Sequence, residues 1–169
     1  MALVLEDGTG LSTSNAFVSI TEANAYFVAR SDTTWTAVAP TDALKEGAIL
    51  YATRILSNCY EWPGTILDDG ATPQALAWPR NYAWDRDGRE LLLVPALVKD
   101  ATCELAKFEL SNPAATAVSR NQTLSSVSLG KLAVSFRDDA PTLAFLPFIS
   151  KLLAPILIGS SFTARAIRG

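Results

Sequence analysis

The sequence predicts a mainly α fold: a small helical bundle with a β-hairpin and extended N- and C-terminal arms. Two patterns carry this prediction. Apolar residues recur at three- and four-residue spacing over residues 43–61 and 95–111. Large apolar residues at every second position mark two short strands within residues 127–136, on either side of Gly130 and Lys131. A chain of 169 residues can bury a core of its own. We therefore expect one helical domain over residues 1–141 and a C-terminal apolar helix with a tail over residues 142–169.

The first helix is expected after Ser19. Ser19 and Glu22 have the spacing of a capping box, in which each side chain accepts a hydrogen bond from the backbone amide of the other residue at the start of a helix. Two short apolar pieces precede it, at residues 2–5 and 17–20, on either side of a glycine-rich turn at residues 6–10. These pieces could pair with each other or form an arm that contacts a neighbouring subunit.

Two long helices follow. Thr41 or Asp42 is expected to cap the first, and Pro95 occupies the first helical position of the second. The predicted core faces consist of Leu44, Ala48, Tyr51 or Ala52, Ile55 and Cys59 in the first helix and of Val98, Ala101, Leu105 and Phe108 in the second. Because Cys59 and Cys103 both fall at apolar helical positions, we expect buried thiols and no disulfide.

Between the long helices, tryptophans, prolines and a polar turn predict a fixed structural corner. Its predicted members are Trp78, Pro79, Arg80, Trp84, Asp85, Asp87 and Gly88.

The C-terminal third is expected to contain a hairpin over residues 124–137, turning at a glycine and contacting other subunits or a tail protein. Its candidate contact residues are Val127, Leu129, Gly130, Lys131 and Leu132. An apolar helix over residues 143–158 is interrupted by two prolines and is too short to span a membrane. Residues 159–169 form a small basic tail.

The sequence carries no pattern typical of an enzyme. The chain contains no histidine, so Ser-His and Cys-His nucleophile pairs cannot form. The S-x-x-K string at residues 128–131 falls on the predicted hairpin turn instead of a helix start. The aspartate-rich turns at residues 68–70 and 85–88 lack the ligand spacing of a calcium loop. We expect no catalysis, no cofactor and no metal.

A nucleic-acid site is an alternative that the sequence leaves open. Aromatic and basic residues interleave along residues 78–89, as in proteins that stack single-stranded bases and hold phosphates. The residues concerned are Trp78, Arg80, Tyr82, Trp84, Arg86 and Arg89. The net charge of −3 and the acidic neighbours oppose strong phosphate binding and favour a packed corner with arginines at its rim.

Five strings in matching order resemble a family of tailed-phage head–tail connector (adaptor) proteins, some of which are labelled DnaT-like single-stranded-DNA-binding proteins. The strings lie at residues 6–11, 18–27, 74–80, 85–88 and 94–106. The resemblance covers about residues 3–140.

This resemblance implies a virion protein of the phage neck, made in the host cytoplasm, that forms a ring of twelve copies docked on the portal. Such a ring would extend the DNA channel, through which the genome passes without tight binding, and would offer a platform to tail or neck proteins. The resemblance also implies a portal-binding C-terminal tail, whose candidate residues here are Phe162, Arg165, Ile167 and Arg168.

Overall fold

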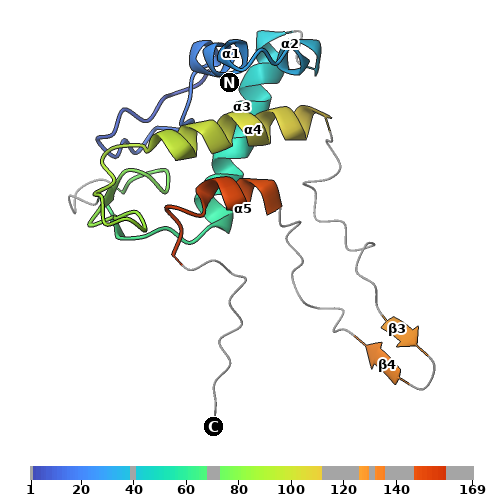
Figure 1. Cartoon of the computed structure of the whole chain (residues 1–169). Helices are drawn as coiled ribbons and strands as arrows, with labels where there is room; N and C mark the ends of the chain where they lie inside the picture. The colour runs from blue at the N-terminus through green and yellow to red at the C-terminus, as the bar shows by residue number, and fades with distance from the viewer. Residues whose placement is uncertain are drawn as a thin grey trace.

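The computed structural model describes residues 2–38, 41–67, 73–111, 126–129, 132–135 and 147–158. Helices are the main regular elements of this part of the chain, and the expected mainly α fold with a β-hairpin is confirmed (Figure 1). The helices are α1 (Ile20–Ala29), α2 (Thr34–Val38), α3 (Asp42–Cys59), α4 (Ala96–Ser111) and α5 (Pro147–Leu153).

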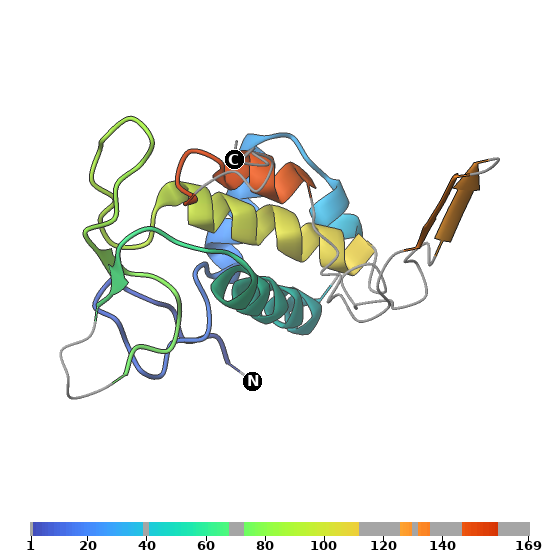
Figure 2. The same cartoon turned by 90° about the horizontal axis from the view of Figure 1, so that it is seen from below.

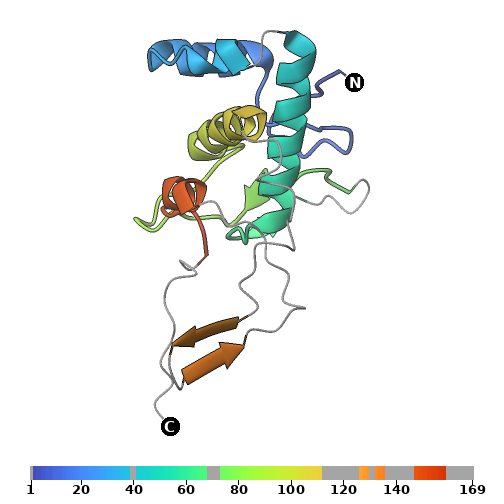
Figure 3. The same ribbon diagram turned by 90° about the vertical axis from the view of Figure 1, so that its right-hand side faces the viewer.

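The core lies where α4 packs across α3 (Figure 3). Val98, Ala101 and Leu105 of α4 are fully buried, as predicted. The predicted core face of α3 is partly wrong. Leu44 is 46% exposed, whereas Ile49, one position after the expected Ala48, is completely buried.

α1 and α2 cover one end of the α3–α4 pair, and their aromatic side chains complete the core. Phe27 of α1 stacks on Trp35 of α2 with ring centroids 5.0 Å apart, and both side chains are 1% exposed. The capping box at the start of α1 is confirmed, because the Ser19 hydroxyl accepts from the Glu22 amide while the Glu22 side chain accepts from the Ser19 amide. Local sequence and tertiary burial therefore agree on the position of α1.

α5 packs along α4 on the other side of the bundle (Figure 1). Ile149 and Leu153 are completely buried, and Phe148 lies 5.6 Å from Phe108, measured between ring centroids. The predicted helix over residues 143–158 is shorter than expected: among the described residues it ends at Leu153 and continues as turns that include Pro155.

Strands are short. β3 (Ser126–Leu129) pairs antiparallel with β4 (Leu132–Ser135), so the pairing of the predicted hairpin is confirmed; its expected turn residues Gly130 and Lys131 lie outside the described residues. The sequence did not predict the second pair, β1 (Thr65–Ile66) with β2 (Arg80–Asn81).

The N-terminal segment folds against the protein's own core, so the expected extended arm is wrong; of the two alternatives, pairing is the nearer, since Leu5 forms a bridge with Ala16. Ala16, Phe17 and Val18 are almost completely buried. The Glu6 carboxylate, 3% exposed, accepts hydrogen bonds from three backbone amides and from the Ser14 hydroxyl, at 2.8–3.1 Å. This buried carboxylate closes the loop over residues 6–14, in which Gly8 lies against Leu93.

Candidate interaction surface

The predicted structural corner divides into a packed part and an exposed part. Trp78 is completely buried and packs edge-on against Trp62 with ring centroids 5.7 Å apart, and the Trp78–Pro79 peptide bond is cis. Trp84 is 51% exposed and is not part of the core. Proximity in sequence suggested one unit, but only Trp78 and its neighbours meet the helices.

Arg80 belongs to the packed part. Its guanidinium group donates to the backbone oxygens of Pro63 at 2.6 Å, Gly64 at 2.8 Å and Ala77 at 3.2 Å. These three bonds use its donors to tie β2 to the segment that follows α3 and to Ala77. The side chain is therefore a structural clamp and is poorly placed to hold a phosphate.

The exposed part is a narrow loop that folds back on itself. Backbone hydrogen bonds join Asp85 N–H to Arg89 O and Leu91 N–H to Ala83 O, each at 2.8 Å. At the tip, the Asp85 carboxylate accepts from the amides of Asp87 and Arg89. These backbone hydrogen bonds, of which the one from Arg89 has the largest effect, lower the pKa of Asp85 and favour its charged form.

The charges at this tip are mutually satisfied. Arg89 lies 3.0 Å from the Asp85 carboxylate and 3.1 Å from that of Asp87, while the Arg86 side chain, 67% exposed, lies 3.8 Å from Asp87. Residues 80–93 contain three arginines and three acidic residues, so this segment has no net charge. It offers little excess positive potential to a nucleic acid.

Large apolar side chains gather on the same loop. Tyr82, Trp84, Leu92 and Leu93 are 77%, 51%, 68% and 61% exposed, and we refer to these four residues as the loop patch. Tyr82 and Leu93 also have positive φ angles of 55° and 56°, a conformation that is unfavourable for such side chains. Strain of this kind persists where the surrounding structure enforces it, and it is frequent at functional sites. The patch therefore has the properties of an interaction surface.

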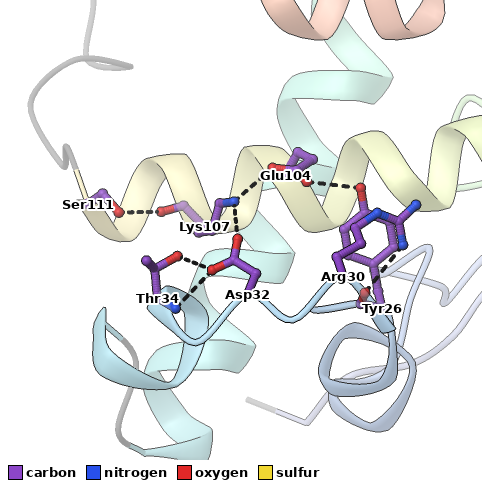
Figure 4. A network of polar contacts seen from close by, with 7 residues as sticks. All are labelled: Tyr26, Arg30, Asp32, Thr34, Glu104, Lys107 and Ser111. Carbon is purple, nitrogen blue, oxygen red and sulfur yellow. Dashed lines mark hydrogen bonds and ion pairs between the residues drawn. The ribbon is translucent and has the colours of Figure 1, made fainter. Parts of the chain in front are cut away.

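A second polar cluster fastens the α1–α2 connection to α4 (Figure 4). Lys107 lies 2.7 Å from the Asp32 carboxylate and 3.1 Å from that of Glu104, which also accepts from the Tyr26 hydroxyl at 2.9 Å. The Arg30 guanidinium lies over the Tyr26 ring, 3.5 Å from its centroid. Burial and the Glu104 hydrogen bond raise the pKa of Tyr26 above its usual value. Each group has a partner, so this cluster is structural.

The other predicted site residues lie elsewhere. Val127, Leu129 and Leu132 are in the β3–β4 hairpin, and the candidate tail residues Phe162, Arg165, Ile167 and Arg168 lie outside the described residues. Cys59 is half-buried and Cys103 buried, both as free thiols. Within the described ranges, no helix is long and apolar enough to cross a membrane, and no group of three metal-ligating side chains comes together.

Sequence reasoning missed Leu92 and Leu93. The signal was present, since four consecutive apolar residues at positions 91–94 follow a polar turn directly. Only Leu91 and Val94 of this run pack against the core, which leaves Leu92 and Leu93 largely exposed, although Leu93 also lies against Gly8.

The fold and its loop patch define a small helical protein with an exposed, charge-balanced apolar surface. A family model described as putative DnaT-like ssDNA binding protein matches residues 1–169, so the chain belongs to that family. No curated protein and no solved structure matches the chain.

Proposed function

We propose that this protein is a structural subunit that acts by docking on other proteins, as the head–tail adaptor of a tailed phage. The observation that supports the proposal is the loop patch. Four large apolar side chains are exposed on one loop without net charge, and exposed apolar surface of this kind is typical of protein interfaces. The resemblance to connector proteins supplies the more specific part: a ring on the portal that extends the DNA channel.

The test of this proposal is assembly with purified portal rings of the same phage, observed by electron microscopy. The wild-type protein should add a symmetric layer to the ring. Leu92→Asp should abolish the layer, since it places a charge in the centre of an apolar contact. Val28→Asp is the matched control, because Val28 is 77% exposed on α1, outside the patch, and its substitution should leave the layer intact. Absence of any layer with the wild-type protein would refute the adaptor proposal.

Binding of single-stranded DNA is the second candidate, and the description of the family favours it over the adaptor. The structural observation in its support is that Tyr82 and Trp84 are exposed on the same loop as Arg86. Exposed aromatic rings can stack on bases of any sequence, each contributing about 1–3 kcal/mol.

Fluorescence anisotropy with a labelled oligothymidylate distinguishes the two candidates. A DNA-binding protein should lose affinity about 5- to 150-fold when Trp84 is replaced by Ala, the equivalent of one lost stack. Arg86→Glu should weaken it further, whereas Leu92→Asp should have a smaller effect. If micromolar protein leaves the oligonucleotide free at low salt, the DNA-binding candidate is rejected and the assembly experiment stands alone.

A further inference from the structure

The loop that carries the loop patch is a two-stranded ribbon whose hydrogen bonds fix which backbone groups face outward. Figure 2 shows this loop, before the start of α4, projecting away from the helices. Trp84 and Glu90 form an antiparallel bridge, and its two bonds, each 2.8 Å long, are made by the residues on either side of them. In a pair of this type the amide and carbonyl groups of the two bridged residues point away from each other. Each arm therefore turns these groups to an outer edge of the ribbon.

The chain itself occupies one of these two edges. On the arm with Trp84, the next outward amide is that of Arg86, which donates to the backbone oxygen of Pro155 at 2.9 Å. The other edge is open. Within the described ranges, no hydrogen bond reaches the backbone groups of Glu90, or those of Leu92, the next residue along this arm that faces the same way. Both residues are exposed, and we refer to the backbone of residues 90–92 as the open edge.

The side chains along the open edge indicate what could lie there. Glu90 is exposed and forms no ion pair with any of the described residues. Trp84 lies directly opposite in the bridge, so it shares the face of the ribbon with Glu90, and so does Leu92 two positions further on. A carboxylate between two apolar side chains repels phosphates and acidic segments. It suits an extended polypeptide in which a lysine or arginine alternates with apolar residues.

We propose that the protein on which this subunit docks adds an extended segment to the open edge, as a third strand of the ribbon. The backbone groups of Glu90 and Leu92 form its hydrogen bonds. A basic side chain of the segment lies at Glu90, and its apolar side chains pack on Trp84 and Leu92. In this mode of recognition, main-chain hydrogen bonds give affinity and side chains give specificity. The inference rests on the proposed function, because it specifies how the loop patch holds its protein partner.

Glu90→Pro tests the added strand, because proline removes one outward amide and leaves both bonds of the bridge in place. Its affinity for purified portal rings should fall about 5- to 150-fold, since a carbonyl group of the added strand loses its donor. Glu90→Gln is the matched control. It keeps the amide and removes only the charge, so it should lose about fivefold at most. Urea unfolding checks that both variants fold.

Hydrogen exchange resolved to single residues gives a second measurement on the wild-type protein. On the portal ring, the amides of Glu90 and Leu92 should exchange more slowly than in the free protein. The Leu91 amide is the internal reference, because it already donates to Ala83 O and should change little.

The outcomes separate this inference from the proposed function. If the ring binds Glu90→Pro as tightly as the wild type, or leaves the exchange of both amides unchanged, the added strand is wrong. The docking function then stands as long as Leu92→Asp abolishes the layer. If the wild-type protein does not bind the ring, both are wrong. Protection of the two amides by oligothymidylate alone would also overturn the inference, because the occupant would be a nucleic acid.

Discussion

Gly64 allows the segment after α3 to approach the loop that carries the patch, and its replacement by Ala is the most direct test of this arrangement. Gly64 has a φ of +71°. A Cβ atom at this position would collide with the backbone oxygen of Asn81 and lie 2.9 Å from both the amide nitrogen of Ala83 and the carbonyl carbon of Tyr82. All three neighbours are backbone atoms, which cannot rotate away.

Gly88 is the matched control. Its φ of +76° is almost the same, but a Cβ atom there would meet nothing within 4 Å. Both replacements by Ala impose the left-handed backbone on a residue with a side chain, at about 1–2 kcal/mol. Gly64→Ala adds a steric conflict of about 1–3 kcal/mol, as for other overpacked sites. We therefore expect Gly64→Ala to reduce the free energy of unfolding by about 1–3 kcal/mol more than Gly88→Ala.

Urea unfolding followed by circular dichroism measures this difference, and binding of the partner measures its effect on the patch. Because the clash lies directly against Tyr82, Gly64→Ala should also weaken partner binding under conditions in which the variant remains folded. Gly88→Ala should bind normally. Equal losses of stability in the two variants would contradict the close approach of Gly64 to β2.

Two further predictions concern the core and the polar cluster on α4. Trp62 donates a hydrogen bond to Leu56 O at 3.0 Å, whereas the Trp78 indole N–H has no partner among the described residues. In urea unfolding, Trp62→Phe should therefore lower the free energy of unfolding by about 1–3 kcal/mol more than Trp78→Phe. A larger loss for Trp78→Phe would contradict this. Hydrogen bonds, of which the one from Lys107 has the largest effect, lower the pKa of Asp32 from 3.8 to about 2. The ionised Asp32 therefore stabilises the fold fully at a pH above the pKa that this group has in the unfolded chain, and the stabilisation is lost as the pH falls towards about 2. In thermal unfolding between about pH 5 and about pH 2, Lys107→Gln should therefore show a smaller decrease in Tm than the wild type, and an unchanged decrease would refute this role of the ion pair.

Local signals in the sequence were sufficient to predict α1, α3 and α4, but not the short helix α2, which lies in a segment that we expected to be a linker. The capping box at Ser19 and Glu22 depends on residues three positions apart, and it was found as expected. α4 begins directly after Pro95, which fits the preference of proline for the start of a helix. In α3, by contrast, the spacing was compatible with two adjacent stripes, and only packing against α4 decides that Ile49 is buried and Leu44 exposed.

The interaction surface could be predicted only in part, because exposure depends on tertiary contacts. Trp78 and Trp84 look equivalent in the sequence, yet one packs against Trp62 and the other projects into solvent. The Glu6 carboxylate accepts hydrogen bonds from the amides of residues two, four and five positions after it in an irregular loop, and this spacing matches neither a helix nor a strand. Such a feature appears only when the backbone path is known.

The balance of charge on the loop patch distinguishes the two candidate functions most sharply. Arg80 is engaged by carbonyl groups and Arg89 by two carboxylates, so Arg86 is the cation of this segment with the weakest internal contact. Each phosphate neutralised on a single strand contributes about −0.7 to the slope of log affinity against log salt. Binding through this surface should therefore have a slope no steeper than about −1, which is shallow for a protein that depends on phosphates. A much steeper slope would place the DNA contacts on cations outside the patch, and would leave its apolar residues for a protein partner.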